Sequence, residues 1–164
     1  MGARHLPGIR PVTGPITWDL AAWYYLYGNR TGSTSDIDYF EFKIGASYTP
    51  VTNWTLGGTV FLTPDQGLAA TDNISVEGTL AYTLPKIGQF DTQISGLLGH
   101  SESGKNSDYP TGYWLGEDSY TYWNVGVKAT VEKFFMDLRY WDTTLDNGLA
   151  DERVVFSVGV NLLP

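Results

Sequence analysis

Apolar and polar residues alternate with a period of two along most of the 164-residue chain. In the segment 123–131 every second residue is apolar, from Trp123 to Val131, and the residues between them are small or polar. The segment 154–162 shows a similar alternation. Because successive side chains of a strand point to opposite faces, these segments predict strands with one apolar and one polar face. The pattern therefore predicts an all-β protein.

Eight strands are predicted, and the connections between them alternate in length. Long loops follow the first, third, fifth and seventh strands, and short turns follow the others. An up-and-down antiparallel arrangement would collect all long loops at one end, as in outer-membrane barrels. We expect an irregular N-terminal segment at 1–15, one β-barrel domain at 16–164, and both termini at the short-turn end. The predicted strands are 16–27, 36–48, 54–63, 73–84, 90–100, 121–132, 134–142 and 153–163.

The charged residues of these strands fall mostly on one parity, the one opposite to the large apolar side chains. Exceptions are Asp36, Asp38 and Asp142, which lie near strand ends. A charge on a lipid face costs about 2–4 kcal/mol at the bilayer midplane for Arg or Lys, and less near the interfaces. The split predicts an apolar face toward lipid and a charged network lining the lumen. That network comprises Asp19, Glu41, Lys43, Glu77, Asp91, Lys128, Asp137 and Arg139, with Glu132 and Arg153 at strand ends.

A soluble, lipocalin-like barrel that binds a small ligand is the alternative, with the apolar face turned inward. An eight-stranded interior has room for packed side chains or one small ligand. The apolar set would crowd that interior, whereas small polar residues inside and large apolar residues outside suit a membrane barrel. We therefore favour a transmembrane β-barrel of about eight strands. The bulky members of the apolar set include Trp18, Phe40, Phe42, Trp123, Tyr140 and Phe156.

Composition narrows the function classes further. The chain has no cysteine, which excludes disulfides and thiolate metal sites. Its net charge of −8 argues against nucleic acid as a partner. No apolar run is long enough for a membrane-spanning helix. Residues 1–14 lack the apolar core of a secretory signal peptide, so we expect an exported protein of this sequence to be a mature or shortened form.

The C-terminal third resembles a known family. The segments YWNVGV at 122–127, MDLRYWDT at 136–143 and ADERVVFSV at 150–158 are similar to the uncharacterised proteobacterial Gcw family of predicted outer-membrane barrels. The resemblance extends over roughly 16–163 and implies fold and location, but no chemistry. Family members begin with a signal peptide and further strands that this chain lacks. The chain also ends in Leu163 and Pro164, not in the aromatic residue typical of such barrels.

Few residues suggest chemistry. His5 and His100 have no cysteine and no well-placed second histidine to complete a site, so we expect no catalytic, cofactor or metal site. The charged network is interpreted as salt bridges that fill the lumen, since eight strands leave no open channel; a polar lining for solute passage is the alternative. Aromatic residues of the longest loop and its edge are either a ligand-binding surface or a membrane-interface girdle: Tyr109, Tyr113, Trp114, Tyr120 and Tyr122.

These patterns together predict a non-enzymatic bacterial outer-membrane barrel with both termini on the periplasmic side. It would be either a structural barrel or a pore-forming component whose solute the sequence does not name. Its partners would be a lipid bilayer or detergent. A homo-oligomer, or additional strands from a longer chain, would be further partners if the chain is the C-terminal part of a larger barrel.

Overall fold

The fold is all-β, in a computed structural model that describes residues 2–5, 8–26, 38–67, 69–113, 116–148 and 150–161. The strands of these residues belong to one antiparallel sheet. They are β1 Gly2–His5, β2 Val12–Thr13, β3 Ile16–Leu26, β4 Tyr39–Val51, β5 Trp54–Thr63, β6 Asn73–Thr83, β7 Asp91–Ser103, β8 Ser119–Val131, β9 Phe134–Thr143 and β10 Arg153–Val160.

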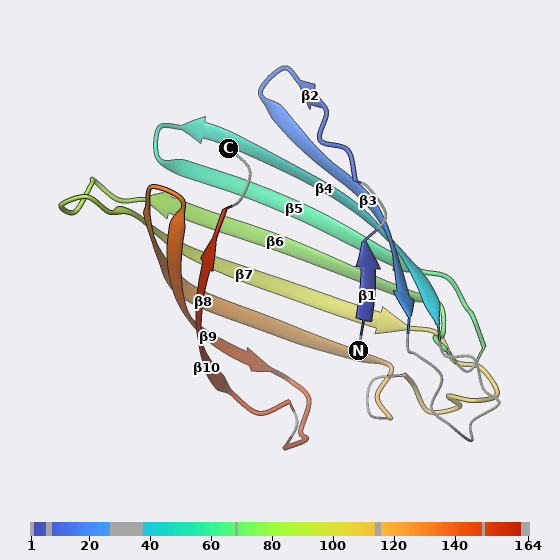
Figure 1. Ribbon diagram of the computed structural model, residues 1–164. Coiled ribbons are helices and arrows are strands. Elements are labelled where there is room, and N and C mark those ends of the chain that lie inside the picture. The colour runs from blue at the N-terminus through green and yellow to red at the C-terminus, as the bar shows by residue number, and fades with distance from the viewer. Residues whose placement is uncertain are drawn as a thin grey trace.

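The sheet is an up-and-down meander that curls strongly (Figure 1). From β3 to β10 each strand pairs with the next one in the chain, and β1 and β2 both pair with β3. The sheet is therefore nine strands wide. Short turns join β4 to β5 and β8 to β9 at one end, the turn end, while long connections such as 64–72 and 104–118 lie at the other, the loop end.

The eight predicted segments correspond to β3–β10, but the prediction of an irregular N-terminal segment at 1–15 was wrong in part. Gly2 pairs with Leu26 and Thr13 pairs with Ile16, so the short strands β1 and β2 both run antiparallel to β3. Ile9 adds an isolated bridge to Leu20. Residues 2–13 lack the apolar alternation that revealed the other strands, which is why the sequence pattern did not predict them.

The sheet edges are not joined, so the predicted closed barrel of about eight strands is not present. Neither β1 nor β10 pairs with a strand across the opening. An odd number of alternating strands leaves the first and the last running in the same direction, as Figure 1 shows for β1 and β10. The added strand also brings Gly2 beside Leu26 at the loop end, whereas β10 ends at the turn end. The expectation that both termini lie at the turn end was therefore wrong for the N-terminal strand.

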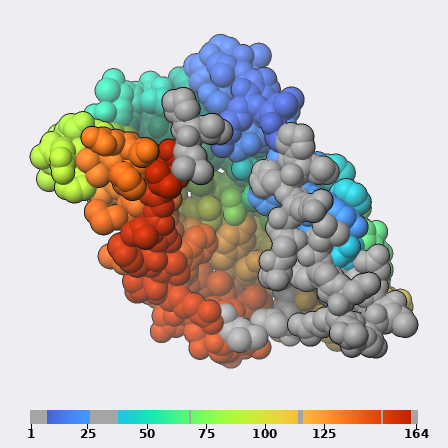
Figure 2. Space-filling model, in the orientation of Figure 1, coloured from blue at the N-terminus to red at the C-terminus, as the bar shows by residue number. Residues whose placement is uncertain are grey.

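The two faces of the sheet follow the alternation of the sequence. In β4, Phe40, Phe42 and Ile44 are exposed, whereas Glu41 and Lys43 between them are only partly exposed. Among the described residues, side chains of strands two apart meet on the second face, for example where Trp23 of β3 lies against Phe61 of β5 with ring centroids 5.7 Å apart. Since alternate strands of a curved sheet approach one another on its inside, we call this the concave face and the first the convex face. Figure 2 shows the molecule hollowed between β10, in red, and the N-terminal residues drawn in blue.

Apolar burial is nearly absent. Among the described apolar residues only Ala69 and Ala70 are buried, while Leu98 is 62% exposed and Phe156 63% exposed on the convex face. Soluble monomers rarely expose large contiguous apolar patches. Most of the exposed apolar surface of the described residues therefore lies on the convex side of the curved sheet.

No helix among the described residues is long and apolar enough to cross a membrane.

Candidate functional site

The convex face carries an aliphatic band between two belts of aromatic side chains. The register places Leu20, Ile44 and Val60 side by side in the middle of β3, β4 and β5. Ring contacts reinforce both belts, with centroid distances of 4.7 Å for Trp54–Tyr82 at the turn end and 4.4 Å for Tyr24–Phe40 at the loop end. The turn-end belt is Trp18, Tyr48, Trp54 and Tyr82; the loop-end belt is Tyr24, Phe40, Trp123 and Tyr140.

Charged side chains on the convex face are confined to the loop end. The described ones are Asp38, Asp72, Glu102 and Asp142, each at the loop end of its strand or directly before it. Glu102 was taken as a loop residue from the sequence, but β7 extends to Ser103 and brings it onto this face. Between the belts the convex face of the described strands is free of charge. This arrangement matches the depth dependence of the cost of charge in a bilayer.

The concave face carries the predicted charged residues, and the first of its clusters surrounds Asp19. Its carboxylate accepts from Lys43 Nζ at 2.7 Å and from Arg10 at 3.3 Å. Lys43 Nζ also lies 5.9 Å from the ring centroid of Trp23. These side chains come from β3, β4 and the N-terminal segment, so the cluster ties that segment to the sheet.

A second cluster is centred on Arg139 of β9. Its guanidinium donates to both carboxylate oxygens of Asp137, at 3.2 and 3.1 Å, and to the amide oxygen of Asn124. It also reaches Ser95 of β7 at 3.0 Å. Gly126 lies between Ser95 and Arg139 in the register, and a Cβ there would crowd the Arg139 side chain. The glycine therefore leaves room for an arginine that spans two strands.

Two carboxylates without a cation form the third cluster. Glu41 accepts from Tyr25 Oη at 3.2 Å and from Thr63 Oγ1 at 3.3 Å, and Glu77 accepts from Tyr122 Oη at 2.9 Å. The two carboxylates are near enough to interact electrostatically. None of the ion pairs among the described residues includes either of them. Hydroxyl groups, and not basic side chains, therefore solvate this part of the concave face.

Gly99 makes the bond between Tyr122 and Glu77 possible. It lies between them in the register, paired with Glu77 of β6 on one side and Tyr122 of β8 on the other. A Cβ at Gly99 would overlap the Tyr122 ring, so the ring lies across the glycine to reach β6.

The remaining predicted network residues are not part of these clusters. Lys128 is paired in register with Asp137, but its Nζ lies 4.5 Å from the ring centroid of Phe135. Asp91 pairs with Lys86 at 3.4 Å near the turn end, where both side chains are more than half exposed. The predicted single network is thus three separate clusters and an exposed pair. Register alone does not decide the ion pairs, because Lys128 is level with Asp137 while Asp137 pairs with Arg139 of its own strand.

Sequence reasoning missed a polar cluster at the loop end of the concave face. Ser75 and Ser101 share a 2.7 Å hydrogen bond, and Asn73 donates to Ser101 at 3.3 Å. Ser101 is fully buried. Beyond it, Asn106 donates to Asp65 at 3.1 Å and holds two long loops together. Alternating serines within the strands were the one available signal.

The described loop aromatics do not lie in the belts of the convex face, which disfavours the girdle, one of the two interpretations of these residues. Tyr120 and Tyr122 lie on the concave face, with ring centroids 5.3 Å apart, and Tyr109 packs edge-on against Tyr113 within the loop. Trp114 lies outside the described residues. The alternative, a ligand-binding surface, is untested.

The two histidines, for which no catalytic or metal site was expected, lie in different places. His100 is an exposed strand residue on the convex face, and its Nδ1 lies 3.0 Å from Thr121 Oγ1. His5 is in β1, and its side chain lies outside the described part. Among the described residues no group of three or more carboxylate or histidine side chains is placed to hold a metal ion. No protein-family profile, curated protein or solved structure shows significant similarity to this chain.

Proposed function

We propose that the chain forms a transmembrane β-barrel in a bacterial outer membrane, with the convex face toward lipid and the concave face toward a polar lumen. The observation that carries the proposal is the segregation of side chains. The large apolar residues are exposed on the convex face, while the ion pairs of the strands lie on the concave face. A soluble ligand-binding barrel needs the opposite arrangement, with apolar residues inside.

Two further features support membrane insertion. Aromatic girdles at both interfaces are a property of outer-membrane barrels, and the convex face has a belt of aromatic rings near each end. The strands β3 to β9 are 10 to 13 residues long, near the 9–11 residues that cross a bilayer when tilted. On this proposal the turn end and the C-terminal strand face the periplasm.

Closure of the barrel is part of the proposal. The strands β3 to β10 alternate in direction, so β3 and β10 are antiparallel and can pair, whereas β1 and β10 run the same way. The N-terminal segment occupies the free edge of β3 through two short, separated pairings and one bridge. Release of that segment would allow an eight-stranded barrel. A second copy, or further strands of a longer chain, are other ways to cover the same edges.

The concave clusters support a structural rather than a channel role. Lys43 bridges β4 to the neighbouring β3, while Arg139 reaches from β9 across β8 to β7 and Tyr122 reaches from β8 across β7 to β6. Side chains that span strands in this way would fill a narrow lumen. We therefore propose a non-enzymatic structural barrel, with a pore as the second candidate, and we retain membership of the Gcw family as a proposal that rests on the three C-terminal segments.

Reconstitution tests the proposal. The purified chain is folded from urea into phosphatidylcholine vesicles, floated on a density gradient, and then measured in planar bilayers. We expect stable flotation that alkaline carbonate does not remove, and no unitary conductance. A chain that remains monomeric and folded in buffer without detergent or lipid would contradict the membrane proposal. Discrete conductance steps would replace the structural role by the pore.

A further inference from the structure

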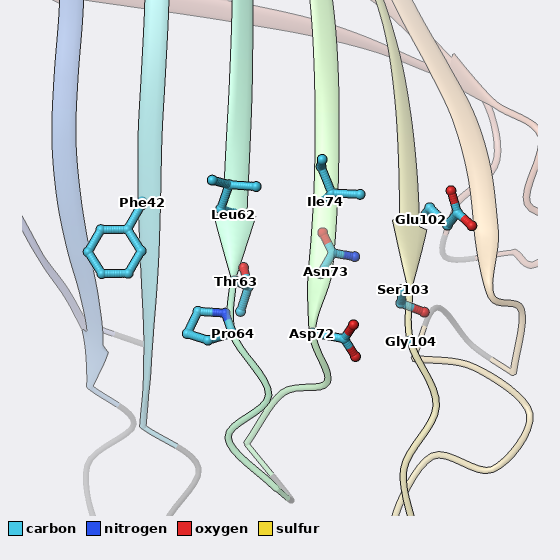
Figure 3. A pocket seen from close by; sticks show the side chains of 10 residues that line it. All are labelled: Phe42, Leu62, Thr63, Pro64, Asp72, Asn73, Ile74, Glu102, Ser103 and Gly104. Carbon is cyan, nitrogen blue, oxygen red and sulfur yellow. The ribbon is translucent and has the colours of Figure 1, made fainter.

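A groove on the convex face lies at the loop end of β4, β5, β6 and β7 (Figure 3). Its volume is about 590 Å³, within the range of pockets that hold small organic ligands. It is lined by Phe42, Leu62, Thr63, Pro64, Asp72, Asn73, Ile74, Glu102, Ser103 and Gly104.

One part of the groove is apolar. Phe42, Leu62 and Ile74 come from three adjacent strands, and the register pairs Leu62 with both of the others. All three are between 37% and 47% exposed. They form a continuous row across β4, β5 and β6, which Figure 3 shows beside the loop connections. An alkyl chain laid along this row would be held by the hydrophobic effect, because it would remove apolar surface from water.

The other part of the groove is acidic. Glu102 of β7 is paired in register with Ile74 of β6. Asp72 lies opposite Gly104, whose backbone N–H donates to the Asp72 carbonyl at 2.7 Å. A Cβ at Gly104 would overlap the Asp72 carboxylate, so the absence of a side chain there sets where this carboxylate lies.

Neither carboxylate has a basic partner within the described part of the chain. Lys105, which follows the groove residues directly, is paired with Asp118 at 3.2 Å. The ten residues that line the groove also include no Lys, Arg or His. The groove therefore presents two negative charges next to an apolar row, and no basic side chain of the described residues pairs with either of them.

We propose that this groove binds an amphipathic molecule with an alkyl chain and a cationic ammonium head. The alkyl chain would lie along Phe42, Leu62 and Ile74, and the head would lie between the carboxylates of Asp72 and Glu102. Charge complementarity selects the head, because an ammonium group supplies the cation that the two carboxylates lack. The site is separate from the concave face and goes beyond the proposed barrel function.

The test uses the full chain in dodecyl maltoside and three probes of equal chain length: octyltrimethylammonium, octyl sulfate and octyl glucoside. Native mass spectrometry counts bound molecules across a titration of each probe. We expect saturable one-to-one binding of octyltrimethylammonium only. The variant D72N/E102Q should weaken that binding at least tenfold, and D146N/D151N, which removes two exposed acidic groups of the loop 144–152, should leave it unchanged.

Gly104→Ala separates position from net charge, because it displaces the Asp72 carboxylate and alters no charge. We expect it also to weaken octyltrimethylammonium binding. Equal binding by D72N/E102Q and the unchanged chain would overturn the proposal, as would binding of octyl sulfate that requires Mg²⁺, which would indicate an anionic head bridged by a divalent ion. Because the protein is already in neutral detergent, neither result depends on whether the barrel proposal holds.

Discussion

The convex and concave faces are built from the same strands but obey opposite rules. Neighbouring residues such as Ile44 and Lys43 of β4 differ only in the face to which they point, yet one is exposed and apolar and the other is ion-paired with Asp19. In water this arrangement would be inverted, since apolar groups gain by burial. The proposed membrane setting accounts for this difference, because it would make the solvent outside the curved sheet less polar than its interior.

Glycines show the same difference between faces. A Cβ at Gly99 on the concave face would overlap Tyr122, while a Cβ at Gly78 on the convex face would meet nothing within 4 Å. The concave glycines are therefore part of the packing, whereas the convex face tolerates added volume. Side chains reach strands two apart on the inside of the sheet, whereas the ring contacts on its outside join adjacent strands.

The largest expected effect comes from charging the convex face. Ile44→Arg should lower the free energy of unfolding from vesicles by about 2–4 kcal/mol, because Ile44 lies between the two aromatic belts. Lys43→Arg, one residue away on the concave face, should change it by less than about 1 kcal/mol. Urea titration followed by tryptophan fluorescence measures both. Similar midpoints for the two variants would remove the distinction between the faces.

A smaller effect is expected from breaking the Arg139 cluster. Arg139→Met leaves Asp137, Asn124 and Ser95 without their shared donor, and a hydrogen bond to a charged group contributes about 1.5–3 kcal/mol. Lys86→Met, which removes the exposed pair with Asp91, should cost about 0–1 kcal/mol. The same urea titration compares them. If Lys86→Met proved as costly as Arg139→Met, the concave clusters would not be the internal framework argued above.

The smallest expected effect compares the two glycines. Gly99→Val should destabilise the fold by about 1–3 kcal/mol, because its side chain would displace the Tyr122 ring from Glu77. Gly78→Val should be neutral or slightly stabilising, since valine favours strands and the convex side is open. Thermal unfolding in dodecyl maltoside measures the change in stability of both variants. An equal loss at both positions would mean that strand backbone, and not the concave packing, requires glycine.

The strands were predictable because two kinds of local signal agreed. The segment 54–63 was predicted with the bounds that β5 has, since apolar alternation ends there at turn-forming residues on both sides. The parity of the charges also indicated correctly that Glu41 and Lys43 share a face. Where alternation fades into serine, as in the last residues of β7, the predicted strand was three residues too short.

Contacts between strands that are not neighbours could not be predicted from the sequence. The bond from Tyr122 to Glu77 depends on the register of three strands and on Gly99 at the crossing point. The pairing of β1 with β3 rests on no apolar pattern at all. The acidic groove likewise arises only when β6 and β7 bring Asp72 and Glu102 to the same loop end.

Two tryptophans at the same level of neighbouring strands offer the most direct test of the central claim. Trp123 of β8 is on the convex face, and Trp141 of β9, which pairs with the adjacent Asn124, is on the concave face. Single-tryptophan chains that retain one or the other, with the remaining tryptophans replaced by phenylalanine, are folded into vesicles of lipids brominated on their acyl chains. The account predicts strong quenching of Trp123 fluorescence and little quenching of Trp141. Equal quenching of both, or stronger quenching of Trp141, would contradict a lipid-facing convex surface.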